Sequence, residues 1–123
     1  MNTVKINGKD YPMYGSGESM IIFMDELKSD LFETLGLFSM ALAQGNIPNT
    51  VHTAKLMYAF IKGANPNAFA SFEMFMKSCR SIKTFIEVDN ITAVQSEIND
   101  LMDVGSLVED NEEEPKKKVT ENL

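Results

Sequence analysis

The hydrophobic pattern of this chain changes its period once, near Ser16, and that change constrains the fold more than any other feature. Before it, apolar and polar residues alternate, which is the period of a β-strand. After it, apolar residues recur every three to four positions, which is the period of an α-helix. The sequence therefore predicts a mainly α-helical domain of about five helices, preceded by a short β-hairpin.

The dipeptide Asn7-Gly8 predicts where the alternating segment turns, because both residue types tolerate the positive φ angles of a type I′ turn. A two-residue loop pairs Ile6 with Lys9. Pro12 removes a backbone donor, so we expect the second strand to be an edge. Because an isolated hairpin is marginally stable, residues 1–15 should rest their apolar face on helices or on another subunit.

Helix-capping and helix-breaking residues divide the expected helical body, residues 16–105, into segments. The predicted starts are at Ser16, at Asp30, at Asn49 or Thr50, at Asn65-Pro66, and at Asp89 or Asn90. The predicted stops are Gly45-Asn46, Gly63 and Gly105. The predicted core stripes are Met20, Met24, Leu27 and Leu31; Leu31, Leu35, Phe38 and Leu42; Val51, Ala54, Tyr58 and Ile61; Phe69, Phe72, Met76 and Cys79; and Ile91, Val94, Ile98 and Leu101.

Charged residues dominate the end of the chain. Residues 109–123 contain six acids and three lysines, with little apolar area to offset the loss of chain entropy. We therefore expect residues 106–123 to form a disordered, charged tail.

The composition excludes several classes of site. A single cysteine rules out an intramolecular disulfide. One cysteine and one histidine also supply too few ligands for almost every structural zinc site. The formal net charge of −7 disfavours binding to nucleic acid or to an anionic membrane surface. No apolar run approaches the roughly 20 residues that span a bilayer, so we expect a soluble, intracellular protein. No metal or other cofactor is predicted.

Candidate catalytic residues are isolated from one another. The segment Gly15–Ser19 is rich in glycine and serine but lacks a phosphate-loop or nucleophile-elbow pattern, so a turn and helix cap explain it better. His52 and Cys79 each stand without a catalytic partner at recognisable spacing. Asp100 and Asp103 fit a solvated helix face. The sequence therefore predicts a protein that is not an enzyme.

Binding is the better category, because the chain contains nine methionines and eight phenylalanines and no tryptophan. These residues are densest between Phe69 and Met76. In a helix, Phe69, Phe72 and Met76 cover one side and Phe75 widens it. Two interpretations stay open: the four side chains belong to the core, or they line a surface for a partner.

The opening residues, Val4-Lys5-Ile6-Asn7-Gly8-Lys9-Asp10-Tyr11-Pro12, are similar to the start of tail assembly chaperones from long-tailed phages of Gram-positive bacteria. A helical body of about 90 residues and an acidic tail that contains a lysine run resemble the same family. The resemblance covers the whole chain in layout.

The resemblance implies a non-catalytic role in tail morphogenesis, carried out in the host cell cytoplasm by a protein that is absent from the mature virion. Such chaperones bind the long, apolar, helical tape measure protein and keep it soluble. The resemblance also implies self-association and, by ribosomal frameshifting near Lys116-Lys117-Lys118, a longer form that recruits tail tube subunits.

A second class of function stays open at this point. A small, acidic, helical protein can mimic DNA, or act as another kind of inhibitor or adaptor. That interpretation requires acids arrayed along a surface, whereas one third of them lie in the predicted tail.

Overall fold

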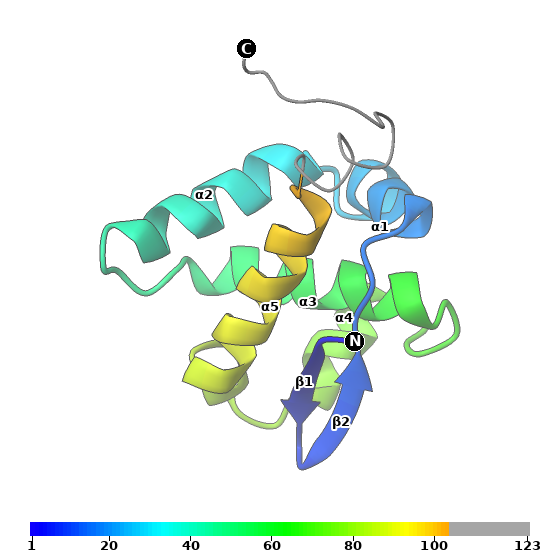
Figure 1. The fold of residues 1–123 in the computed structure, drawn as a ribbon. Helices are drawn as coiled ribbons and strands as arrows, with labels where there is room; N and C mark the ends of the chain where they lie inside the picture. Colours follow the sequence, from blue (N-terminus) through cyan, green and yellow to red (C-terminus); the bar gives the residue numbers. More distant parts are fainter. Residues whose placement is uncertain (104–123) are drawn as a thin grey trace.

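The computed structural model describes residues 1–103, which form a β-hairpin and a helical body packed together (Figure 1). The predicted fold class, mainly α with an N-terminal hairpin, is confirmed. The elements are β1 (Thr3–Ile6), β2 (Lys9–Pro12), α1 (Gly17–Ile21), a π-helical turn η1 (Ile22–Glu26), α2 (Leu31–Ala43), α3 (Thr50–Ala64), α4 (Phe72–Ser78), a 3₁₀ turn η2 (Ile82–Phe85) and α5 (Val88–Leu101). The predicted tail, residues 106–123, and the predicted stop at Gly105 lie outside the described residues.

The hairpin has the predicted register. Ile6 pairs with Lys9 across the antiparallel strands, and Asn7 and Gly8 adopt φ angles of 53° and 82° in the turn. Val4, Ile6 and Met13 are buried, because β1 packs on α5 and β2 on α3. The hairpin thus rests on helices of its own chain.

Helix α3 runs through the middle of the body, with α1, α2, α4 and α5 around it (Figure 1). Its residues from Thr53 to Ile61 are buried except for Lys55. Of the two predicted caps, Asn49 and Thr50, Asn49 caps its start: its side chain accepts from the N–H groups of Val51 and His52. Val51 itself is exposed, so its assignment to the core was wrong: it lies in the first turn, before α3 enters the body.

Helices α2 and α5 follow their predicted stripes closely. Asp30 caps α2 through the N–H groups of Phe32 and Glu33, and α2 ends before Gly45, which has a φ of 79°. Ile91, Val94 and Ile98 of α5 are buried, as predicted. The cap of α5 was predicted two to three residues too late, because the extended N-cap position is Glu87.

The prediction for the first helical stripe was confirmed at Leu31, which is buried, and at Leu27, which packs against the core, but it was wrong at Met20 and Met24. Met20 and Met24 are exposed, whereas Ser19, Ile22 and Phe23 are buried against the body. The reason is a close contact between α1 and α3, in which the Ser19 hydroxyl donates to the carbonyl of Ala59 at 2.7 Å. A small polar residue therefore occupies the centre of this contact. The spacing of apolar residues does not predict its burial.

The predicted helix start at Asn65-Pro66 was also wrong, because residues 65–71 form a loop with one turn and α4 begins at Phe72. The Asn65 side chain accepts from the N–H of Asn67 at 3.1 Å and closes a local turn. The Lys62 ammonium donates to the carbonyl of Phe69 at 2.6 Å and holds the loop against α3. The N-cap of α4 is Ser71, which accepts from the N–H of Met74.

Candidate functional site

Three of the four predicted partner-binding residues gather in one aromatic cluster on the inner side of α4. The ring of Phe75 lies 5.0 Å from that of Phe69 and 6.2 Å from that of Phe72, centroid to centroid. Its other ring contacts are with Tyr58 of α3, at 5.5 Å, and with Phe85 of η2, at 6.2 Å. Phe75 has no exposed surface, so the core interpretation holds for this residue.

Phe69 and Phe72 are half-buried at the edge of the aromatic cluster, and Met76 is exposed beside it. These three residues can still be reached from outside, so their role toward a partner stays a prediction. Together they form a rim of the core.

A carboxylate on the π-helical turn holds α4 in place. Glu26 accepts from the Tyr58 hydroxyl through Oε1 at 2.7 Å and from the N–H of Phe72 through Oε2 at 2.6 Å. Burial raises the pKa of Tyr58, and the hydrogen bond to Glu26 raises it further, so the phenol keeps the proton that it donates. The aromatic cluster is therefore attached to η1 as well as to α3.

The isolated candidate catalytic residues do not come together. Ser16 is the N-cap of α1, and His52 lies in the first turn of α3. Burial raises the pKa of the Cys79 thiol, which lowers its thiolate fraction. Within residues 1–103, no group of three or more histidine, cysteine, aspartate or glutamate side chains is arranged to hold a metal ion. In the same range no helix has the length and apolar character needed to cross a bilayer.

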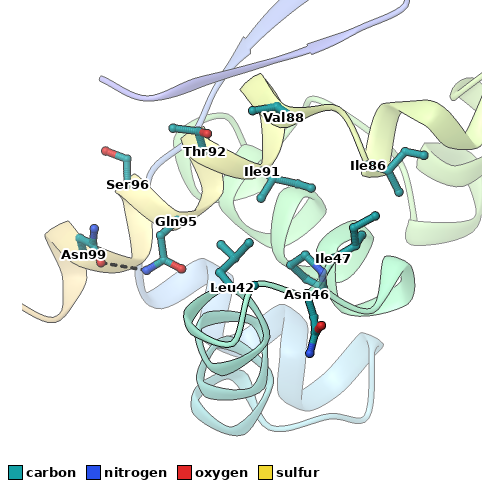
Figure 2. A pocket seen from close by; sticks show the side chains of 12 residues that line it. Leu42, Asn46, Ile47, Ile86, Val88, Ile91, Thr92, Gln95, Ser96 and Asn99 are labelled. Carbon is teal, nitrogen blue, oxygen red and sulfur yellow. Dashed lines mark hydrogen bonds between the residues drawn. The ribbon is translucent and has the colours of Figure 1, made fainter.

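A cleft of about 560 Å³ opens between the C-terminal end of α2, the loop that follows it, and α5 (Figure 2). Leu42, Ile47 and Ile91 point into it from these three segments. Ile47 is 70% exposed and Val88 is 76% exposed. We call it the α2–α5 cleft; its lining residues are Leu42, Gly45, Asn46, Ile47, Pro48, Ile86, Val88, Ile91, Thr92, Gln95, Ser96 and Asn99.

The α2–α5 cleft carries no charged side chain among its twelve lining residues, all of them in the described part of the chain. One wall is the α5 face that runs from Val88 to Asn99, whose polar members are hydroxyls and amides. The Gln95 amide donates to Asn99 at 2.8 Å and its oxygen accepts from Ser39 of α2 at 3.2 Å. A ligand of this cleft would therefore be apolar and uncharged where it makes contact.

This cleft was not predicted from the sequence, although two signals for it exist. Residues 34–54 contain no charged side chain, and the cleft takes Leu42 to Pro48 from that run. On α5, the acids Asp89, Glu97 and Asp100 all lie away from the face that lines the cleft. Either signal alone does not indicate a binding site. The fold brings the uncharged run and the uncharged face of α5 together at the cleft.

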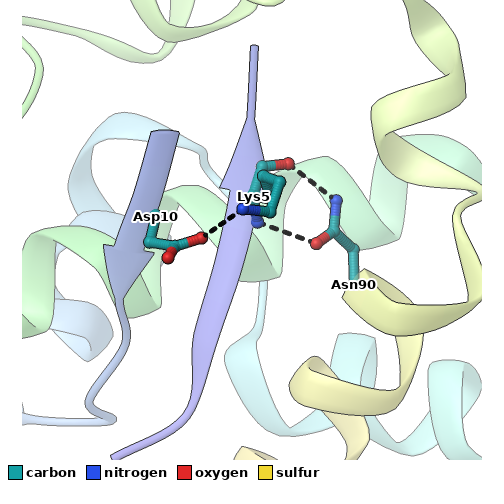
Figure 3. A network of polar contacts seen from close by, with 3 residues as sticks. All are labelled: Lys5, Asp10 and Asn90. Carbon is teal, nitrogen blue, oxygen red and sulfur yellow. Dashed lines mark hydrogen bonds and ion pairs between the residues drawn. The ribbon is translucent and has the colours of Figure 1, made fainter. Parts of the chain in front are cut away.

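The cleft wall is held in place by Asn90, a buried amide at the start of α5 (Figure 3). Its oxygen accepts from the N–H of Lys5 at 2.8 Å, and its nitrogen donates to the carbonyls of Lys5 at 3.0 Å and Thr84 at 2.9 Å. Lys5 in turn pairs with Asp10 of β2 at 3.0 Å. One side chain thus joins α5, β1 and η2.

Replacing Asn90 with alanine is expected to lower the free energy of unfolding by about 2–3 kcal/mol, because three backbone groups lose their partner. Urea denaturation followed by circular dichroism measures this change. Asn99→Ala, which removes an exposed amide from the same helix, should change stability by less than about 0.5 kcal/mol. Equal effects of the two substitutions would show that Asn90 does not anchor the wall.

No family model, no curated protein and no solved structure matches the chain.

Proposed function

We propose that this protein is a non-catalytic phage tail assembly chaperone that binds the tape measure protein and keeps it soluble during tail morphogenesis. The observation that carries the proposal is the uncharged, apolar α2–α5 cleft, which is suited to a segment of an apolar helix. The resemblance of residues 4–12 to the start of such chaperones supports the same function.

The dimensions of the α2–α5 cleft suit a helix. From Val88 to Asn99 its α5 wall spans about 16 Å, which is three turns of a bound helix. Ile47 and Val88 stand at its opening and would bury most of their exposed side chains against such a helix. Since the cleft offers no charge to pair with, it can accept an apolar helix in many registers, as a chaperone for a long repetitive helix requires.

Further parts of the proposal concern assembly. Several copies of the protein, self-associated along one tape measure chain, would gain affinity by avidity. A longer form made by frameshifting at Lys116-Lys117-Lys118 would recruit tail tube protein; these lysines lie outside the described residues. Peptides that cross this junction in a larger product of the native gene would identify that form. The protein would act in the host cytoplasm without a cofactor and be absent from the virion.

Replacing Ile47 and Val88 with aspartate is expected to abolish solubilisation of the tape measure protein, because both charges would be buried beside apolar surface on binding. The measurement is the soluble fraction of the tape measure protein of the same phage after co-expression. Met74→Asp is the matched control: Met74 of α4 is 53% exposed and does not line the cleft. Full solubilisation by the double variant, with its fold retained, would contradict the proposal.

The second candidate function is that of an acidic DNA mimic. It is favoured by an uneven charge distribution, since residues 14–43 and 94–103 contain eight acids and one lysine. Such a mimic would bind a basic nucleic-acid enzyme and would dissociate from it as the salt concentration rises. Binding in the α2–α5 cleft would be insensitive to salt, so a salt titration of any captured partner separates the two functions.

A further inference from the structure

A second apolar groove lies at the opposite end of α5 from Val88. It measures about 460 Å³ and forms where α1, the start of α2 and the end of α5 meet. We call it the α1–α2 groove. Phe32, on its edge, is 51% exposed, and Met20 is exposed beside it. Its lining residues are Tyr14, Gly15, Ser16, Gly17, Met20, Leu31, Phe32 and Leu101.

The segments that build the α1–α2 groove are strongly acidic. Residues 14–43 and 94–103 contain a single base, Lys28, and eight acids. Asp30 and Glu33 flank the groove residues Leu31 and Phe32, and Asp100 precedes Leu101. The field over this end of the molecule is therefore negative, which favours a cationic partner surface.

The other end of the molecule carries the complementary features. Ile82, in η2, is 78% exposed and lies between Arg80 and Lys83 in the sequence. Lys83 and Lys5, which pairs with Asp10, line one shallow hollow beside it, together with one acid, Glu87. The described residues outside the groove segments contain seven bases and four acids. An exposed isoleucine among cations is thus presented at the end where α5 begins.

We infer that Ile82 of one copy inserts into the α1–α2 groove of a second copy, with the cations around Ile82 facing the acids around the groove. This inference rests on the self-association in the proposed function and names its contact. The side chain of Ile82 would remove the exposed apolar surface of Met20 and Phe32 from water.

The two surfaces cannot be the same patch, because η2 precedes α5 and Leu101 ends it, about 20 Å further along the helix. A contact between different patches is heterologous, so each copy keeps one free groove and one free Ile82. Copies therefore add head to tail, and they form an open row when the rotation between neighbours does not close a ring. Such a row would carry one α2–α5 cleft for every copy.

Sedimentation velocity of the full chain over a concentration series tests the inference. At low salt we expect a ladder of species beyond the dimer, which shrinks as salt is added because the facing charges are screened. Ile82→Asp and Phe32→Glu should each leave only monomer. Ile47→Asp is the matched control: it introduces the same kind of charge at an equally exposed apolar residue, outside both surfaces, and should leave the ladder intact.

Mixing the two monomeric variants is the decisive experiment. The Ile82→Asp protein keeps its groove and the Phe32→Glu protein keeps its isoleucine, so an equimolar mixture should form a one-to-one dimer that grows no further. A mixture that stays monomeric would overturn the inference, as would a wild-type protein that is monomeric up to millimolar concentration or stops at a symmetric dimer.

Three further outcomes also separate the alternatives. Association that appears only after residues 104–123 are removed would overturn the inference, since the occupant of the groove would then be the same chain. Loss of the ladder with solubilisation of the tape measure protein retained would support the contact and leave the chaperone proposal standing. Loss of solubilisation in Ile47→Asp with the ladder intact would locate the two functions on separate surfaces.

Discussion

Replacing Phe75 with alanine is expected to lower the free energy of unfolding by about 3–5 kcal/mol, the range for removing a fully buried phenylalanine. Its ring lies within 6.2 Å of four other rings, those of Tyr58, Phe69, Phe72 and Phe85. Alanine would leave a cavity between α3, α4 and η2 that these rings cannot fill without moving. The measurement is the urea midpoint and slope, followed by circular dichroism.

Met76→Ala supplies the control, because Met76 is the exposed neighbour of Phe75 on the same helix. It should change the free energy of unfolding by less than about 1 kcal/mol. If Phe75→Ala were as mild as Met76→Ala, the aromatic cluster would not hold α4 to the body. A folded Met76→Ala or Phe72→Ala protein that no longer binds the tape measure protein would instead support the predicted partner role of these residues.

Replacing Gly63 with alanine is expected to lower the free energy of unfolding by about 2–3 kcal/mol, as overpacking at a rigid contact does. Gly63 lies in the last turn of α3, where an added Cβ would meet the backbone carbonyl of Tyr14 and the hydroxyl of Ser19. The Tyr14 carbonyl cannot swing away as a flexible side chain could, because its residue is tied to α3 by a hydrogen bond from the Tyr14 N–H to Phe60. The segment before α1 would have to move.

Gly36→Ala provides the opposite expectation at a second helical glycine. Gly36 lies in α2, is exposed, and would place its Cβ in open space. Alanine there should raise the free energy of unfolding by about 0.5–1 kcal/mol, because alanine loses less backbone entropy than glycine when a helix forms. The same substitution, glycine to alanine, should thus lower the free energy of unfolding at Gly63 and raise it at Gly36. A stabilised Gly63→Ala protein would show that α1 and α3 do not approach closely.

Local signals were sufficient where a segment carries its own stop or start. Asn7-Gly8 predicted the turn and register of the hairpin, because a two-residue turn with positive φ leaves no other pairing. Asp30 and Asn49 predicted the starts of α2 and α3, since each side chain accepts from N–H groups within the first turn. These interactions span few residues, so the sequence contains both partners side by side.

Local signals were insufficient where a tertiary contact decides which residues are buried and where a helix begins. Asn65-Pro66 has the form of a helix start, but Lys62 and the aromatic cluster hold the following loop against α3 until Ser71. Met20 and Met24 have the spacing of a core stripe, but the contact of Ser19 with Ala59 orients α1 with Met20 outward, and Met24 is exposed in the π-helical turn η1. The spacing of apolar residues shows neither outcome, because Ala59 lies 40 residues from Ser19 and the aromatic cluster takes Tyr58 and Phe85 from other elements.

The sequence by itself determined that this chain forms a hairpin followed by a helical body, because period, caps and turn residues act over one or two turns of chain. It also determined the excess of methionine and phenylalanine and the uneven distribution of charge. Only the tertiary structure decided which apolar residues remain exposed. The reason is that burial depends on how two elements pack against each other. The packing of α4 buries Phe75 in the core, whereas α2 and α5 leave the uncharged cleft around Ile47 and Val88 open.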